Sequence, residues 1–410
     1  MGCFDRHRAE GLELTVPSGA TAHIELEEET DLFLTKTQLS ETQALSLYNH
    51  PHFDLEWPNP GNDFHFKLRS KGWVGHFPVG DSVIVVKPKV PIASIFGMLE
   101  VAYKLKSFKI GEGETAVQSL DEVYQHIASI LAQRVNDRWR KGLYRTYVVR
   151  SEDLEWVRGR IDIRNNIRNV VAASARLHCH YEELTADVDE NAVLLWALHV
   201  ASRLHLSREE VRQQVRRAHR NLAGDVTLQP KTAHDCVGRL YNRLNDDYKP
   251  MHGLCRFLIE HTGPSIDIGG QQFLPFSIDM AQLFEAFVAE FLAQKLPQNL
   301  KIDIQYHARL AANADLSFRI DLVVRDRMSG KPLSVIDTKY KISGLPAESD
   351  IQQVIAYAVE LGVSRAYLVY PFEIKQPIEV KVGGIKVSTL GIDLRSPFAQ
   401  IWSMLLPLAR

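Results

Sequence analysis

The sequence predicts an α/β C-terminal region, a mixed sheet flanked by helices, preceded by a β-rich N-terminal domain and a mainly helical middle region. Three patterns carry this prediction. Apolar and polar residues alternate near the N-terminus, apolar residues recur at helical spacing in the middle, and strand-like and helix-like segments alternate toward the C-terminus. We therefore expect domains at residues 1–92, 93–270 and 271–410.

The bulk composition is that of an ordinary globular protein. The 410 residues are 45% hydrophobic and 24% charged, with a net charge of -2. A nucleic-acid surface would therefore have to be a local patch. The four cysteines form no CxxC pair, which fits reduced thiols in a cytoplasmic protein. No apolar run has the length of a transmembrane helix, so we expect no membrane association.

The N-terminal domain is predicted to consist mostly of strands. Period-2 alternation runs through residues 11–36, where the acidic run from Glu27 to Glu29 is interpreted as a solvated strand end. Residues 39–49 predict a short helix capped by Ser40. An ordinary solvated surface is the favoured explanation for several basic residues of this domain, and a partner-contact surface is the alternative: Lys67, Arg69, Lys71, Lys87 and Lys89.

The middle region contains two features that bear on function. Residues 207–223 predict a basic helix capped by Ser207, with either a solvated or a DNA-binding face. The segment HCH places His178 and His180 on one face of a strand. Histidine is a common zinc ligand, but the sequence offers no distant ligand pair to complete a site, so we do not predict zinc there.

The segment from Ser317 to Tyr357 contains the candidate catalytic residues. Asp321 ends the strand-like SFRID, and IDTKYK carries Asp337 and Lys339 on one strand face, with the Thr338 side chain expected in the opposite layer. Phosphodiester hydrolysis needs a cation that neutralises charge and activates water, and Mg²⁺ prefers hard oxygen ligands.

We therefore predict that Asp321, Asp337 and the Thr338 carbonyl hold Mg²⁺, with Mn²⁺ as the alternative ion. Lys339 is expected near the attacking water or the scissile phosphate. Three accessory residues are predicted. Glu285 lies at the border of the apolar stripe of a helix over 280–296, and Gln353 and Tyr357 lie one turn apart on a helix over 348–361. An Asp-x-Lys pair alone is common on surface strands. The full combination favours metal-dependent nucleic-acid cleavage over a structural ion-pair network.

The order helix, strand, acid, hairpin, Asp-x-Lys and helix resembles the PD-(D/E)xK nuclease superfamily, and QVIAY resembles its RecB-like branch. The segments LFEAFVAEFL, IDTKYK, VRGRID and YEELTADVDEN together resemble the McrC family, the nuclease subunit of McrBC modification-dependent restriction systems. One departure is Ile320, which occupies the position of the superfamily's proline.

The McrC resemblance implies a metal-dependent endonuclease that cleaves double-stranded DNA through Asp321, Asp337 and Lys339. It further implies an AAA+ GTPase partner of the McrB type, into whose ring the N-terminal domain docks and whose nucleotide hydrolysis it stimulates. The absence of a P-loop motif from this sequence agrees with a separate motor. Two alternatives stay open: a non-catalytic adaptor that activates an AAA+ motor, and a stand-alone RecB-like DNA nuclease.

Overall fold

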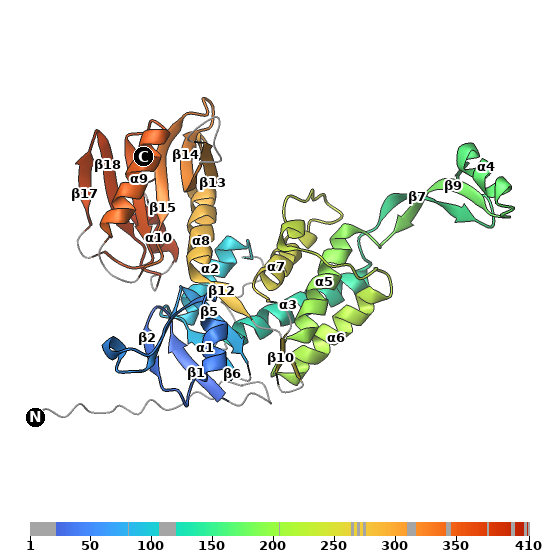
Figure 1. The fold of residues 1–410 in the computed structure, drawn as a ribbon. Coiled ribbons are helices and arrows are strands. Elements are labelled where there is room, and N and C mark those ends of the chain that lie inside the picture. The colour runs from blue at the N-terminus through green and yellow to red at the C-terminus, as the bar shows by residue number, and fades with distance from the viewer. Residues whose placement is uncertain are drawn as a thin grey trace, which may run out of the picture. The chain divides into compact units, whose positions relative to one another are not determined.

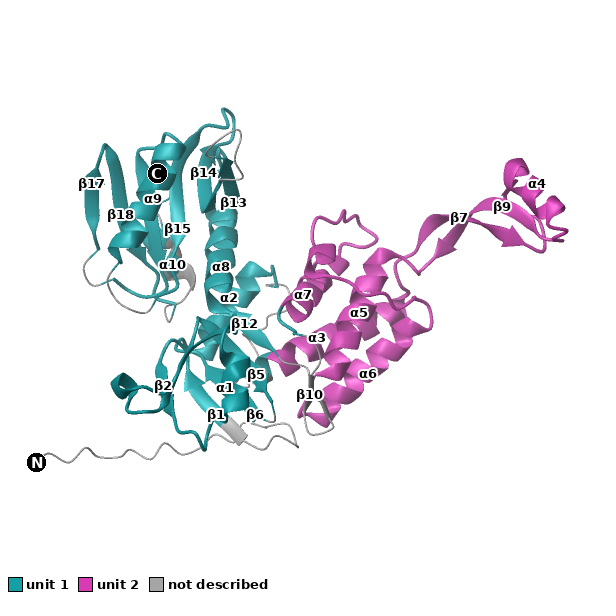
Figure 2. Ribbon diagram, in the orientation of Figure 1, with its two compact units in different colours: residues 1–123, 261–410 teal, residues 124–260 magenta. Residues whose placement is uncertain are grey.

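The structure, a computed structural model, describes residues 22–405 and 408, apart from 81, 106–119, 205, 264–265, 269–270, 274–275, 310–316, 342–345, 375–376 and 395–397. Figure 2 shows its two compact units, residues 1–123 with 261–410, and residues 124–260. The first unit joins the N-terminal and C-terminal ranges that we expected to be separate domains. The predicted strand residues 11–21 lie outside the described residues.

Two sheets form the N-terminal part of the first unit (Figure 1). One has the order β1-β6-β5-β12, with bounds Ala22–Glu27, Ser82–Lys87, Trp73–Val79 and Ser277–Asp279. The other has the order β2-β4-β3, with bounds Asp31–Leu34, Phe66–Ser70 and Phe53–Glu56. Because β12 pairs with β5, a late segment of the chain completes an N-terminal sheet. Gly75 permits this approach, since its φ is +130° and a Cβ there would lie 2.2 Å from the Phe276 carbonyl oxygen.

Helices and short elements complete this part of the unit. α1 (Glu41–Leu47) begins after Ser40, whose side chain caps it as predicted. α2 (Ile92–Ala102) packs against α8 (Met280–Lys295), the long helix that leads into the C-terminal sheet. Among the described residues, this part also has a short 3-10 turn, η1 (Pro60–Asn62), and the antiparallel strand pair β10 (Ile266–Ile268) and β11 (Gln271–Phe273).

The C-terminal part is a six-stranded mixed sheet with helices packed on it, as predicted. Its order is β13-β14-β15-β16-β18-β17, with bounds Leu300–Arg309, Ser317–Asp326, Pro332–Thr338, Arg365–Tyr370, Ile385–Gly391 and Glu379–Val382. β15, β16 and β18 run parallel, and the other neighbours are antiparallel. α9 (Glu348–Glu360) packs on β15, β16 and β18, while α8 contacts β13 and β15 and α10 (Phe398–Leu405) contacts β18. Fully buried Val335, Val354 and Leu368 lie in the core between sheet and α9.

Helices dominate the second unit, and a small sheet interrupts them. The helices are α3 (Leu120–Lys141, which starts in the first unit), α5 (Asp189–Arg203), α6 (Glu209–Ala223) and α7 (Tyr248–Glu260), with a short 3-10 turn, η4 (Ala233–Cys236). The cap predicted at Ser207 is wrong: α6 begins at Glu209, and the Ser207 hydroxyl instead accepts a hydrogen bond from Gln125 at 2.7 Å.

Residues 146–185 form a separate substructure of the second unit, which we call the arm. It consists of β7 (Thr146–Leu154), β8 (Arg160–Ile161), α4 (Ile163–Val171) and β9 (Leu177–Thr185), with the sheet order β7-β9-β8. Among the residues that the structure describes, no helix is long and apolar enough to cross a membrane.

Candidate functional site

The two predicted acids lie on neighbouring antiparallel strands. Leu322 of β14 pairs with Ile336 of β15, so Asp321 and Asp337 face each other one position further along. Residues opposite each other in an antiparallel pair have their side chains on the same face, about 5 Å apart at Cβ. The strand register therefore brings together the two carboxylates that the sequence singled out.

Thr338 binds Asp321 through two donors. Its backbone N–H lies 2.8 Å, and its hydroxyl 2.9 Å, from the same Asp321 oxygen, Oδ2. The expectation that the Thr338 side chain turns away from the acids is therefore wrong. Thr338 is the last residue of β15, and the Asp321 carboxylate binds its N–H where the described ladder between β14 and β15 has ended. That contact also brings the carboxylate within reach of the hydroxyl.

Lys339 connects Asp337 to the predicted Gln353–Tyr357 pair. Its Nζ lies 2.8 Å from Asp337 Oδ2 and donates to Gln353 Oε1 at 2.9 Å. Gln353 in turn donates through Nε2 to the Tyr357 hydroxyl at 2.5 Å. The lysine ammonium is thus held between the strand acid and α9, and all four of these predicted residues meet.

Glu285, on α8, belongs to the same cluster. Gln305 of β13 donates to its Oε1 at 3.2 Å. Gln305 has a φ of +49° and interrupts the β13–β14 ladder opposite Asp321, between the paired positions Ile304–Leu322 and Tyr306–Ile320. A non-glycine residue in this conformation is strained, and such strain is concentrated at functional sites. No sequence signal marked Gln305, because the strand pattern runs through it unbroken.

Two carboxyl groups of this cluster, those of Asp337 and Glu285, resist ionisation. Burial, followed by the nearby Asp321, raises the pKa of Asp337 to about 6 even though Lys339 opposes the shift. Burial and Asp321 also raise the pKa of Glu285 to about 7. Burial alone would lower the pKa of Lys339. The nearby carboxylates, of which Asp337 has the largest effect, raise it by more, so the pKa of Lys339 lies above its usual value. The site therefore holds more negative charge than one ammonium compensates.

The donor set fits a hard divalent cation. Asp337 is 1% exposed. Its Oδ2 is buried and lies 2.8 Å from the Lys339 ammonium. Mg²⁺ is usually held through one or two carboxylates and keeps several waters. Asp321 and Asp337 satisfy that requirement, and the carboxylate of Glu285 is a further hard donor.

Tyr340 links this site to the N-terminal strands. Its hydroxyl donates to Glu28 Oε2 at 3.3 Å, and the Lys89 N–H donates to the same oxygen at 3.3 Å. The interpretation of the acidic run as a solvated strand end is wrong for Glu28, which is fully buried. No local sequence pattern indicates this contact, because it joins residues far apart in the chain.

The basic candidates of the N-terminal domain are mostly neutralised by nearby acids. Lys67 lies 3.0 Å from Glu56, Arg69 lies 3.5 Å from Asp31, and Lys71 lies 2.9 Å from Asp54. Lys87 lies 2.5 Å from Glu25. These pairs support the ordinary solvated surface over a polyanion-binding patch.

Comparison with known proteins identifies the family. A family model described as "McrBC 5-methylcytosine restriction system component" matches residues 68–371, well over half of the chain. The chain belongs to the McrBC family. This membership confirms the resemblance drawn from IDTKYK and its companion segments.

Solved structures from Thermococcus gammatolerans are similar to this McrBC family member. One is a chain in the refined half-complex from a tetradecameric assembly of McrB AAA+ hexamers with bound McrC. The two chains are 17% identical and superpose with a TM-score of 0.55, and the match covers 94% of this chain and 99% of that chain. A chain of the McrBC complex from the same organism has a TM-score of 0.42 at 19% identity, covering 66% of this chain and 87% of that chain. The first likeness supports the fold. No curated protein matches the sequence.

Proposed function

We propose that this McrBC family member is the metal-dependent endonuclease subunit of a restriction complex and cleaves double-stranded DNA. One observation carries the proposal: buried Asp337 lies opposite Asp321 at the end of the β14–β15 pair, and its Oδ2 is 2.8 Å from the Lys339 ammonium. In this proposal the C-terminal sheet is a PD-(D/E)xK core, with the first acid on β14, the second acid on β15 and the lysine directly after β15.

The proposed chemistry assigns each residue a task. Asp321, Asp337 and the Thr338 carbonyl would hold Mg²⁺ or Mn²⁺, and such an ion, when bound, supplies charge neutralisation and an acidified water. Lys339, held by Asp337 and Gln353, presents its ammonium to the attacking water or the scissile phosphate. Glu285, with a pKa of about 7, can exchange a proton at its carboxylate near neutral pH.

We further propose that an AAA+ GTPase drives this nuclease, as the similar T. gammatolerans assembly of McrB with bound McrC suggests. The N-terminal part, residues 1–92, is the proposed docking element. Contacts within the first unit support a mechanical link from it to the nuclease sheet. Tyr340 binds Glu28, and the Ser94 hydroxyl donates to the Leu394 carbonyl at 2.9 Å.

The test is cleavage of methylated plasmid by the full chain reconstituted with its AAA+ partner and Mg²⁺. Asp321→Asn and Asp337→Asn should each lower the cleavage rate about 100-fold or more, since each removes a charged ligand of the ion that stabilises the transition state. Glu379→Gln is the matched control, because Glu379 is an exposed carboxylate in the same sheet, and among the described ion pairs its partner is exposed Lys386. Wild-type cleavage by both site variants would overturn the proposal.

The same reconstitution separates the alternatives. An adaptor would stimulate nucleotide hydrolysis by the partner while the wild-type chain cleaved nothing with either Mg²⁺ or Mn²⁺. A stand-alone nuclease would cleave at the full rate without the partner.

A further inference from the structure

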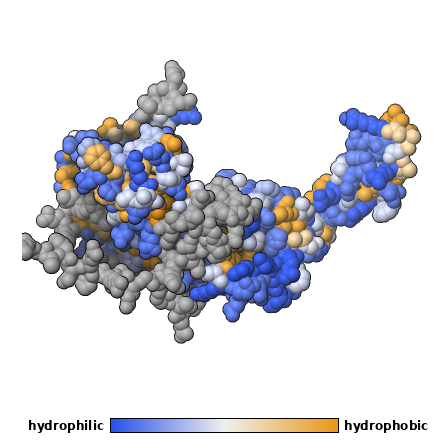
Figure 3. All heavy atoms as spheres, turned by 60° about the horizontal axis from the view of Figure 1, so that its bottom comes forward, coloured by the Kyte–Doolittle hydropathy of each residue, from blue (hydrophilic) through white to orange (hydrophobic). Residues whose placement is uncertain are grey.

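The arm lacks the hydrophobic core that a folded substructure of this kind normally needs. No residue of α4 is buried, and the buried apolar side chains among the arm's described residues are Cys179 and Tyr181. Val170 and Val171 are 76% and 84% exposed, and apolar atoms are visible at the end of the arm in Figure 3. Small structures without an adequate core commonly rely on a disulfide or a metal ion, and Cys179 is a free thiol.

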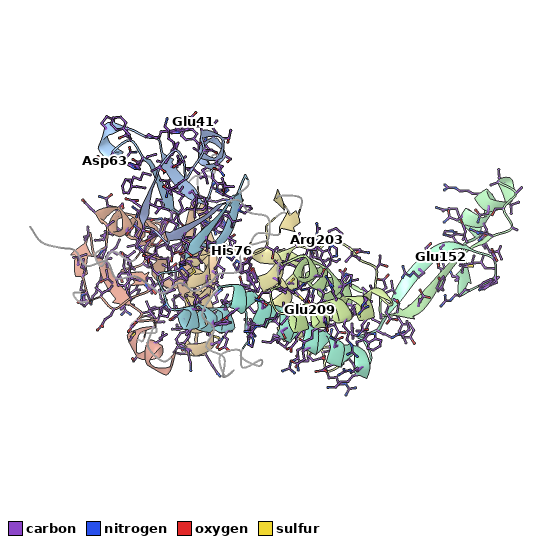
Figure 4. All side chains as sticks on the ribbon, turned by 90° about the horizontal axis from the view of Figure 1, so that it is seen from below. Glu41, Asp63, His76, Glu152, Arg203 and Glu209 are labelled. Atoms are coloured by element: carbon purple, nitrogen blue, oxygen red, sulfur yellow. The ribbon has the colours of Figure 1, made fainter. Side chains whose placement is uncertain are left out.

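Polar contacts hold the strands of the arm together. Figure 4 shows Glu152 on β7, which accepts a short hydrogen bond from the Tyr181 hydroxyl of β9. β8 lies on the other side of β9, where Arg160 pairs with His180. Gly159 permits that approach, because its φ is +68° and a Cβ there would lie 2.3 Å from the His180 carbonyl oxygen. This close approach places Asp162, at the end of the VRGRID segment, beside the two histidines of β9.

Asp162, His178 and His180 form a compact group of potential ligands. One ligand atom from each lies within 4.8 Å of the others, and Asp162 Oδ2 is 2.9 Å from His180 Nε2. Zinc ligands with bond lengths of about 2.0–2.1 Å are roughly 3.3 Å apart around a tetrahedral ion. The observed spacing is therefore that of side chains able to share one ion. Asp162 is the distant ligand that the sequence analysis did not find.

The surroundings orient these ligands. His178 Nδ1 lies 2.9 Å from Asp153 Oδ1, the carboxylate–histidine contact that in metal sites fixes the ring and leaves the other nitrogen for the ion. That other nitrogen, Nε2, lies 2.9 Å from the Ser151 hydroxyl. Asp162 caps α4 by accepting the Asn165 N–H at 3.1 Å.

We propose that Asp162, His178 and His180 bind a zinc ion that ties β8 and the start of α4 to β9. Two imidazoles and one carboxylate suit Zn²⁺, whereas Mg²⁺ prefers oxygen donors, so this site is chemically distinct from the acid cluster of the nuclease sheet. A water molecule or the Ser151 hydroxyl completes the coordination. The proposal goes beyond the nuclease function and does not depend on it.

The test is metal binding by the full chain, stripped with a chelator and then titrated with Zn²⁺ in buffer containing Mg²⁺. The wild-type chain should bind one Zn²⁺ tightly, and Co²⁺ in its place should give tetrahedral d–d absorption. Asp162→Asn, His178→Gln and His180→Gln should each weaken Zn²⁺ binding at least about 10-fold, and Asp153→Asn about 10-fold. Asparagine is a good N-cap, so Asp162→Asn keeps the start of α4 intact.

Two controls make the result specific. His219→Gln changes a histidine of the same unit that lies outside the arm and contacts the His199 ring. This variant should bind Zn²⁺ like the wild type. Asp337→Asn should also bind normally, which separates this site from the nuclease site. The absence of tight Zn²⁺ binding by the wild-type chain, or equal binding by His180→Gln and His219→Gln, would overturn the proposal and leave a hydrogen-bond network only.

Discussion

Thr338 donates both its backbone N–H and its hydroxyl to one oxygen of Asp321, at 2.8 and 2.9 Å. This pair of contacts fixes the first acid of the candidate site against the end of the strand that carries the second acid. In a metal site, the loss of a contact that orients a ligand typically costs about 10- to 100-fold in metal affinity or activity. Thr338 therefore matters through its donors to Asp321 as well as through the carbonyl oxygen that the sequence suggested.

Replacing Thr338 by valine removes the hydroxyl and keeps the N–H contact. We expect the cleavage rate to fall about 10-fold, because Asp321 is less firmly positioned. The free energy of unfolding should fall by about 1 kcal/mol for the lost hydrogen bond. Thr338→Ser keeps a hydroxyl and should restore most of the activity. Equal rates for the valine variant and the wild type would show that the hydroxyl does not position Asp321.

Gln353 is expected to act through Lys339. Gln353→Ala removes the acceptor of the Lys339 ammonium and the donor to Tyr357. Cleavage should slow about 10-fold while the Mg²⁺ concentration for half-maximal activity stays the same, since the acids are untouched. The neighbouring Gln352→Ala is the matched control, because Gln352 contacts only the exposed Glu348 at 3.4 Å among the described side chains. A large change in Mg²⁺ requirement would contradict this positioning role.

Glu285→Gln should stabilise the metal-free chain at high pH. The folded pKa of Glu285, about 7, lies above its ordinary value of 4.5, mainly through burial. Its contribution to stability is therefore fully present below pH 4.5 and is lost as the pH rises to about 7. Glutamine keeps an acceptor for Gln305 without the charge.

The gain from Glu285→Gln should be about 1–2 kcal/mol at pH 8, after allowance for partial solvent exposure, and close to zero at pH 4. Urea unfolding of both proteins at the two pH values, without divalent ions, measures it. A gain of the same size at both pH values would mean that Glu285 ionisation is not its cause.

Tyr340→Phe tests the contact between the nuclease sheet and the N-terminal strands. The variant leaves the buried Glu28 carboxyl with the Lys89 N–H as its remaining contact within hydrogen-bond distance among described residues. The free energy of unfolding should fall by about 1 kcal/mol. Stimulated cleavage should fall more than the partner's nucleotide hydrolysis, because the change lies on the nuclease side of the link. Unchanged stability and cleavage would mean that the contact transmits nothing.

Local patterns in the sequence predicted much of the C-terminal sheet and part of the site. The apolar stripe of α8 predicted that helix to within one residue at its end. The spacing of Asp337 and Lys339 predicted that their side chains lie together, and they do, although Lys339 follows the end of β15. These features follow from periodicities of a few residues, which a single sequence displays directly. The helix-turn spacing of Gln353 and Tyr357 was equally visible.

The features that the sequence did not reveal depend on contacts between distant segments. Glu28 is buried because Tyr340 reaches it, and Asp162 joins His178 and His180 because β8 pairs with β9. The union of the N-terminal and C-terminal ranges in one unit depends on β12 completing the β5 sheet. None of these pairings leaves a mark in the local hydrophobic pattern.

The most direct test of the nuclease assignment is Lys339→Ala in the reconstituted complex, with DNA cleavage and the partner's nucleotide hydrolysis measured in the same reaction. Lys386→Ala is the matched control, because Lys386 lies in the same sheet and pairs only with exposed Glu379 among the described residues. We predict that Lys339→Ala lowers cleavage about 100-fold or more while nucleotide hydrolysis stays at the wild-type rate. Wild-type cleavage by Lys339→Ala, or equal losses in both lysine variants, would contradict the account.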